Sequence, residues 1–364
     1  MKLFRFSTKK ISMMPLLRVS TLFVAVSLIG GIGLTTESAA RNLTVVSWGG
    51  SYQEAQRKAY FEPFMKKTGK KILDESYSGE MAKIKAMVEA KNVTWDVIQA
   101  ETPEVLTACG QGLLEIIDWN RLGGKQIYMP AAIEGECGVG SNVFAYVQVY
   151  DADKIKGEGP NSWADFWNVK RWPGKRALRK IPKVNMEVAL LADGVKPDDV
   201  YKVLSTEEGV KRAFKKLDEL KPNLQWWEAG AQALQWLAAG EVVMTSTWHG
   251  RVKATNQEGH NFKIVWNGQC YGVDAWIIPK GSSNIDLAYE FIKFASDPKN
   301  QAVLASILPY GPTHVKAIAE VDPKVARELP NYPANLKGAL AVNSEWWVEH
   351  WVELTERFNV WVAH

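Results

Sequence analysis

The sequence lacks the motifs of several common enzyme classes. It contains no Gly-x-Ser-x-Gly nucleophile turn, no phosphate-binding Gly-x-x-x-x-Gly-Lys segment and no His-Glu-x-x-His zinc motif. The five histidines show no spacing typical of metal ligands. We therefore expect a protein that is not an enzyme and that has no metal or other cofactor.

Long apolar runs are missing beyond the first 40 residues, so no later segment is expected to span a membrane. In those 40 residues a basic start precedes the uncharged run Val19–Leu34, and Ser38-Ala39-Ala40 supplies the small side chains that a signal peptidase reads. The run is 16 residues long, shorter than the ~20 residues of a membrane span. Residues 1–40 are therefore predicted to be a secretory signal peptide, with an uncleaved anchor as the alternative.

Excess charge of either sign is also missing once the predicted signal is removed. Residues 1–40 hold five of the 44 Lys and Arg and one of the 40 Asp and Glu, so 39 of each remain. This balance argues against nucleic acid and anionic membranes as partners. The composition, 46% hydrophobic and 23% charged, is that of a globular protein large enough for two lobes.

Cysteine is scarce, with three residues in the chain. In an exported protein a disulfide is plausible, and Cys109 and Cys137 are the candidate pair. Cys109 follows a helical stretch, and Cys137 lies in a glycine-rich turn. Cys270 is left over, and we expect an inert thiol there because no His or acid is arranged near it in the sequence.

Short β-rich segments alternate with amphipathic ones from residue 43 onward. Strands are predicted at 43–48, 71–73 and 95–100, and helices at 53–67, at 80–91 and after Thr102-Pro103. This alternation is typical of an α/β fold with a parallel sheet covered on both faces.

Two longer β-rich runs, 143–150 and 273–279, bracket a second α/β block. The chain is therefore expected to leave a first lobe, build a second one and return. Lobe 1 would comprise residues 41–147 and 278–364, and lobe 2 residues 148–277. The two crossing strands would form a hinge, and a ligand would bind in the cleft at the carboxyl ends of the strands.

Aromatic residues gather in the turns that follow predicted strands. The four turns are Trp48-Gly49-Gly50-Ser51-Tyr52, Trp248-His249-Gly250-Arg251, Tyr271-Gly272-Val273-Asp274-Ala275-Trp276 and Pro309-Tyr310-Gly311-Pro312-Thr313. Any one aromatic here could be a core residue. Four such turns together favour an aromatic box, which attracts ammonium groups at about 0.5–2 kcal/mol per ring.

Several segments, in order along the chain, resemble bacterial solute-binding proteins of ABC importers, in the polyamine (spermidine and putrescine) group. They are Trp48-Gly49-Gly50, 64–69, 172–178, 190–194, 240–244, Trp248-x-Gly250, 278–281 and 310–313. The resemblance implies a two-lobe periplasmic binding protein fold of type II, no catalysis, and a monomer in the bacterial periplasm that delivers its ligand to an ABC permease.

The resemblance also implies which residues bind the ligand. The family's ligand contacts fall on Trp48, on Ser51 or Tyr52, and on Trp248, Asp274 and Tyr310. Asp274 would bind an ammonium group, and the rings would cover the ligand's methylenes.

Two positions depart from the polyamine pattern. Gly272 stands where a Trp is usual, and Arg251 ends a turn that usually reads Trp-Asn-Gly-Ser. An arginine in the cleft would repel a polycation and would suit a carboxylate. Arg251 and Asp274 together would fit a zwitterion such as γ-aminobutyrate. Alternatively, Arg251 turns away and leaves a diamine site.

A diamine would need a second acid in the cleft. Glu101, Glu80 and Glu187 are the candidates, although each could be an ordinary surface or helix-end charge. Tyr271 and Trp276 are further, weaker candidates for contact with a ligand.

Two other classes of function stay open. A sugar-binding protein of the same architecture would use the 16 tryptophans for stacking, but these turns are poor in the Asn and Gln that bond hydroxyls. An exported enzyme on this fold would need a nucleophile–base pair or metal ligands, and neither is visible.

Overall fold

One mixed sheet of nine strands forms the centre of the computed structural model, which describes residues 41–133 and 135–364. The predicted signal, residues 1–40, lies outside the described residues. The strand order is β2-β1-β3-β8-β4-β7-β5-β6, and β9 pairs with β8. The strands are β1 (Leu43–Ser47), β2 (Ile72–Ser76), β3 (Val97–Glu101), β4 (Gly138–Asp151), β5 (Arg176–Arg179), β6 (Leu224–Trp227), β7 (Met244–Trp248), β8 (Phe262–Ile277) and β9 (Leu340–Ala341).

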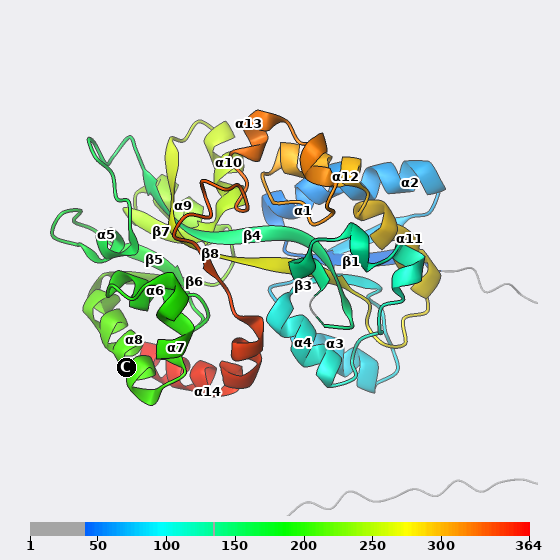
Figure 1. Cartoon of the computed structure of the whole chain (residues 1–364), viewed down its shortest axis with the longest axis horizontal. Coiled ribbons are helices and arrows are strands. Elements are labelled where there is room, and N and C mark those ends of the chain that lie inside the picture. Colours follow the sequence, from blue (N-terminus) through cyan, green and yellow to red (C-terminus); the bar gives the residue numbers. More distant parts are fainter. Residues whose placement is uncertain (1–40, 134) are drawn as a thin grey trace, which may run out of the picture. The chain divides into compact units, whose positions relative to one another are not determined.

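Helices cover the sheet (Figure 1). They are α1 (Gly50–Gln56), α2 (Glu62–Thr68), α3 (Met81–Glu89), α4 (Thr102–Gly110), α5 (Trp163–Trp167), α6 (Asn185–Ala192), α7 (Val200–Leu204), α8 (Glu207–Leu220), α9 (Gln232–Ala239), α10 (His249–Gln257), α11 (Ile285–Ala295), α12 (Pro298–Ile307), α13 (Pro323–Ala326) and α14 (Ser344–Ala363). In the described part of the chain, no helix is both long and apolar enough to cross a bilayer.

Local sequence explains several element boundaries. In α8 the buried residues Val210, Ala213, Leu217 and Leu220 follow helical spacing. Its N-cap is Thr206, whose side chain accepts a hydrogen bond from the Gly209 amide at 3.0 Å. The segment after β7, expected to be a turn, is the first turn of α10 instead.

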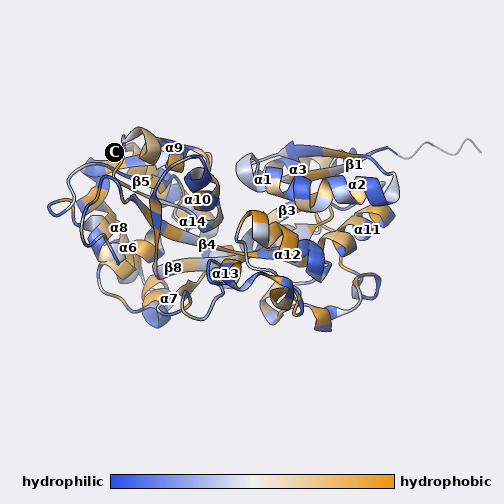
Figure 2. Cartoon of the chain, turned by 90° about the horizontal axis from the view of Figure 1, so that it is seen from above, coloured by the Kyte–Doolittle hydropathy of each residue, from blue (hydrophilic) through white to orange (hydrophobic). Residues whose placement is uncertain are grey.

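Strands β4 and β8 join the two halves of the sheet, as Figure 1 shows. They pair antiparallel along their length, with an irregularity between Tyr146 and Gln148. On one side β8 pairs with β3, which belongs to the parallel set β1–β3, and on the other side β4 pairs with β7. Helices α1, α2 and α11 gather around one end of these strands, and α6, α8 and α9 around the other (Figure 2). The predicted α/β fold with two crossing strands is thus confirmed.

The lobe boundaries stay a prediction, and two contacts bear on them. Residues 271–277, assigned to lobe 2, pair with 138–145 and, through 274–277, with β3. Helix α14, assigned to lobe 1, packs Trp361 and Phe358 against Trp226. Because α14 also packs against α4 of lobe 1, it touches both halves, and we propose only that the lobes divide near Cys270 on β8.

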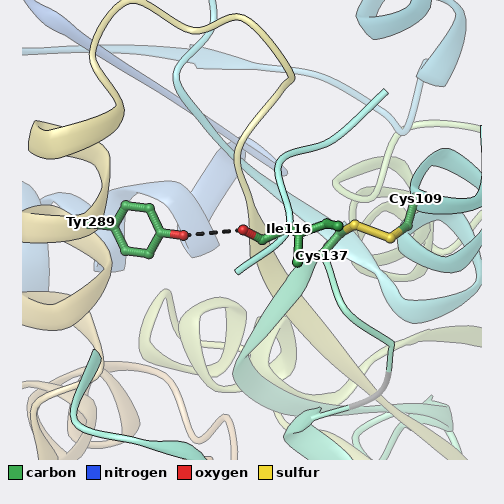
Figure 3. The surroundings of a disulfide bond; sticks show 4 residues. All are labelled: Cys109, Ile116, Cys137 and Tyr289. Carbon is green, nitrogen blue, oxygen red and sulfur yellow. Dashed lines mark hydrogen bonds between the residues drawn. A yellow bond between two sulfur atoms is a disulfide. The ribbon is translucent and has the colours of Figure 1, made fainter. Parts of the chain in front are cut away.

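A disulfide joins Cys109 of α4 to Cys137, just before β4, across 28 residues of sequence (Figure 3). Beside it, the Tyr289 hydroxyl lies 3.5 Å from the Ile116 carbonyl oxygen. Cys270 is a buried free thiol. Burial raises the pKa of this thiol well above its usual range, which is consistent with an inert side chain.

Breaking the disulfide should destabilise the fold, because the crosslink limits the unfolded chain. Cys109→Ser with Cys137→Ser is expected to lower the free energy of unfolding by about 3.5 kcal/mol. Denaturant unfolding of the oxidised, reduced and double-variant proteins measures this. Equal midpoints for all three would contradict the prediction.

Candidate functional site

A small cavity lies where strands from both halves of the sheet end. Its empty volume is about 260 Å³. Its walls are formed by Trp48, Tyr52, Glu101, Trp248, Arg251, Asp274 and Tyr310. The structure thus brings together six of the seven main candidates from the sequence, and the weaker candidate Glu101.

Sheet pairing explains why residues so distant in sequence meet here. Trp48 and Glu101 lie at the carboxyl ends of the adjacent parallel strands β1 and β3. Asp274 lies opposite Glu101 in the antiparallel pair of β3 with β8. Trp248 ends β7, and α10 begins at the next residue and carries Arg251. Positions at strand ends therefore supply three of the seven wall residues, Trp48, Glu101 and Trp248.

Asp274 is a buried acid with neutral hydrogen-bond partners. Its carboxylate accepts hydrogen bonds from Trp48 Nε1 at 3.1 Å and from Asn142 Nδ2 at 3.3 Å. It takes part in no ion pair within residues 41–133 and 135–364. Burial, followed by the nearby charge of Glu101, raises the pKa of Asp274 well above its usual range. This acid therefore lacks a cationic partner.

Arg251 is a buried base. Its Nη2 donates to the Trp48 carbonyl oxygen at 3.2 Å, while Nε has no hydrogen-bond partner. No carboxylate pairs with it in the part of the chain that the structure describes. Burial lowers its pKa. A Cβ added to Gly50, at φ 59°, would lie 2.8 Å from Arg251 Nη1, so glycine permits this approach.

The rings do not form the open aromatic box expected from the sequence. Trp48 stacks on Tyr77 with centroids 4.9 Å apart, and its indole nitrogen faces Asp274. Trp248 already has Arg251 and Arg179 within 5.3 and 5.0 Å of its ring centroid. Its π-face is thus engaged by the protein's own cations. The part of the cavity wall formed by Trp48 and Asp274 is therefore where an ammonium group would fit.

The other sequence candidates lie outside the cavity wall. Trp276 is buried against Phe291, and Glu187 accepts hydrogen bonds from Trp347 Nε1 and Tyr201 Oη at 2.7 and 2.9 Å. Ser51 and Glu80 line two neighbouring surface pockets. Tyr271 is half-buried and not part of the wall.

Sequence reasoning missed residues that position the wall. Asn142 Nδ2 lies 2.8 Å from Tyr52 Oη as well as near Asp274. His249 accepts from the Ala145 amide at 3.2 Å, and its Nε2 lies 2.8 Å from the Pro309 carbonyl oxygen, beside Tyr310. Burial lowers the pKa of His249 to about 4, so the ring is neutral. Asn142 belongs to no motif, and His249 occupies the variable position of Trp248-x-Gly250, so the sequence pattern gave neither residue a role.

The family model described as bacterial extracellular solute-binding protein matches residues 59–334. The chain belongs to this family. The match confirms the predictions of a solute-binding protein and of no enzymatic activity. The family is described as extracellular, which agrees with the predicted export from the cytoplasm. The bacterial periplasm as the destination stays a prediction.

Relatives of this solute-binding protein cover nearly its whole length. It is 49% identical over 342 residues to the gamma-aminobutyric acid-binding protein of Pseudomonas aeruginosa. This alignment covers 94% of this chain and 97% of the relative. A structure titled as a GABA receptor matches with a TM-score of 0.78 and 35% identity, over 88% of this chain and 98% of the other. The periplasmic binding protein MotA from A. tumefaciens B6, in complex with glucopine, matches with a TM-score of 0.83 and 34% identity. The match covers 88% of this chain and 100% of the other.

The polyamine resemblance is supported only at the level of the family. The spermidine/putrescine substrate-binding protein PotD of Streptococcus pneumoniae has a TM-score of 0.68 but 17% identity, over 89% of this chain and 100% of the other. Such a match shows the fold alone.

The unpaired acid should reduce the stability of the unliganded solute-binding protein. Because the folded-state pKa of Asp274 is raised, the folded state binds more protons than the unfolded one between the two pKa values, so stability falls as pH rises through that range. Asp274→Asn should therefore have a higher free energy of unfolding than the parent at pH 7. The difference should vanish at a pH below the pKa of an unfolded Asp.

Urea unfolding of both proteins without ligand, from pH 3 to pH 8, measures the difference. Asp198→Asn, at an exposed position, is the matched control. A destabilised Asp274→Asn variant at pH 7 would contradict the predicted penalty.

Proposed function

We propose that this solute-binding protein captures a short ω-amino acid, γ-aminobutyrate, in the bacterial periplasm and delivers it to an ABC permease. One observation carries the proposal. Asp274 and Arg251 line the same small cavity, both are buried, and neither pairs with an opposite charge among the described residues. A zwitterion would supply one counter-ion to each.

The relatives support this choice of ligand. One relative at 49% identity is named for γ-aminobutyric acid binding, and a structure at 35% identity is titled as a GABA receptor. The ligand's ammonium group would approach Asp274 from the Trp48 side, and its carboxylate would bind Arg251. The methylenes between them would lie against Tyr52 and Tyr310, whose rings meet edge to face with centroids 4.7 Å apart.

Polyamines fit this cavity less well. Arg251 would repel a second ammonium group, and the second acid, Glu101, already forms an ion pair with Lys183 at 2.8 Å. A sugar fits less well too, because the cavity wall includes no Asn or Gln to bond its hydroxyl groups. Binding of a larger polyhydroxylated ligand would leave the two charges without partners.

Closure of the two halves over the ligand follows from where its contacts lie. Asp274 and Trp48 belong to the side of β1 and β3, whereas Arg251 and Trp248 come from β7 and α10. Arg251 already donates to the Trp48 carbonyl oxygen across these two sides, and a ligand with opposite charges at its ends would hold them in this arrangement. The permease would then recognise the closed form. That the protein acts as a monomer stays a prediction.

A titration tests the proposal directly. Residues 41–364 are titrated with γ-aminobutyrate, putrescine and spermidine, and the change in total tryptophan fluorescence reports binding. We expect γ-aminobutyrate to bind with Kd near micromolar, about −8 kcal/mol, and the polyamines to bind far more weakly. Tight binding of the polyamines with none of γ-aminobutyrate would refute the proposal.

Each charge should contribute to binding separately. Arg251→Gln and Asp274→Asn are each expected to weaken γ-aminobutyrate binding about thirtyfold or more, since each leaves one end of a buried ligand unpaired. Arg327→Gln and Asp198→Asn, both at exposed positions, are matched controls and should bind like the parent. Isothermal titration calorimetry gives the affinities. If Arg251→Gln bound as tightly as the parent, Arg251 would have no part in the site.

A further inference from the structure

A buried cluster of charges adjoins the cavity and has no role in the proposed contacts with the ligand. The Lys183 ammonium lies 2.8 Å from Glu101 Oε2 and 2.9 Å from Glu104 Oε1. The Lys183 side chain is 1% exposed and that of Glu101 6%. Buried ion pairs of this kind recover their desolvation cost only with such close geometry, so Lys183 is held specifically.

The backbone around Lys183 is also held in an unusual conformation. Val184, the residue after it, has φ 73°, a value that β-branched residues very rarely adopt. Val184 is itself buried at the start of α6. Strain of this kind persists only where the surrounding structure imposes it. Here it lies in the turn before α6, from which the Lys183 side chain reaches Glu101 at the end of β3 and Glu104 in α4.

Glu101 connects this cluster to the ligand cavity. It lines the cavity and lies opposite Asp274 in the strand register. The cavity wall therefore contains two acids and one base. Arg179, at 3.5 Å, is a more distant partner of Glu101, and its guanidinium also donates to Tyr146 Oη at 2.6 Å. Lys183 is thus the closest counter-ion of Glu101.

The charge state of Glu101 agrees with this pairing. Burial alone would raise the pKa of Glu101, but the charges of Lys183 and Arg179 outweigh it and hold the pKa below its usual value. The pKa of Lys183 is raised: burial acts to lower it, and the two glutamates more than offset that effect. Both groups are therefore charged, and each neutralises the other.

We propose that Lys183 determines the charge class of the ligand, by neutralising Glu101 so that Asp274 alone accepts an ammonium group. This inference rests on the proposed function and adds a specificity-determining residue that does not touch the ligand. Without Lys183, Arg179 at 3.5 Å would be the one described cation left beside Glu101, so the cavity would present more negative charge, as a diamine requires. The same change would disfavour a ligand whose carboxylate must enter the cavity.

The test is a change of ligand preference in Lys183→Met, which keeps the length of the side chain and removes its charge. We expect γ-aminobutyrate affinity to fall about tenfold or more and putrescine affinity to rise about tenfold or more. The reason is that the negative charge of Glu101, no longer balanced by Lys183, would repel the carboxylate of γ-aminobutyrate and attract the second ammonium group of putrescine. Glu101→Gln in the Lys183→Met background should abolish the gain for putrescine. Lys183→Arg should restore the parental preference.

Lys202→Met is the matched control, because Lys202 is exposed and its ion pair with Asp199 lies at the surface. Circular dichroism and thermal unfolding establish that each variant is folded. If Lys183→Met does not fold, Lys183→Gln, which can still donate to a carboxylate, provides the same comparison. A folded variant with no gain for putrescine overturns the inference.

The putrescine measurement separates this inference from the proposed function. If the parent protein does not bind γ-aminobutyrate, the proposed function fails. A gain for putrescine in Lys183→Met that depends on Glu101 would still support the role of Lys183. Conversely, tight binding of γ-aminobutyrate by the parent with no gain in the variant would reject only the role of Lys183.

Discussion

Two opposite charges that are buried in one cavity, without ionic partners among the described residues, are the constraint on which the site depends. Removing a carboxylate and a guanidinium from water costs several kcal/mol each unless counter-ions replace the lost hydration. The protein provides neutral hydrogen bonds instead, from Trp48 and Asn142 to Asp274 and from Arg251 to the Trp48 carbonyl. Burying these two charges therefore lowers the stability of the protein without its ligand, and a ligand that carries both opposite charges would offset this cost.

The sheet makes this arrangement possible because its strands reach both halves of the molecule. Asp274 is fixed by pairing with β3 and β4, and Arg251 by a helix that starts directly after β7. Neither side alone contains both charges. A ligand that bridges them would therefore link binding to closure, and the strands β4 and β8 are the connections that must bend.

The sequence predicted most of the cavity wall because strand ends can be recognised locally. Trp48, Trp248 and their neighbours follow β-rich runs, and parallel strands bring such turns to one edge. Trp276, one of the weaker candidates, lies outside the cavity wall. It lies on the same face as Asp274, two residues further along β8, but there α11 covers the sheet and Phe291 packs on the ring.

Contacts between distant segments could not be predicted from one sequence. Lys183 forms ion pairs with Glu101 and Glu104, which lie some 80 residues earlier in the sequence. The turn that allows this has a positive φ at Val184, which a valine in the sequence does not suggest. Asn142 and His249 act by hydrogen bonds to groups that only the sheet register brings near. The length of β8 was also underestimated, since it begins at Phe262 and not at Val273.

The central claim is that both ends of the ligand are required at once. Titrations with γ-aminobutyrate, n-butylamine and butyrate test it most directly, since the last two each lack one charged end. The account predicts that each truncated ligand binds about a hundredfold more weakly or worse than γ-aminobutyrate, because one buried charge is left unpaired. If either bound as tightly as γ-aminobutyrate, the corresponding buried residue would not be a ligand contact and the account would be wrong.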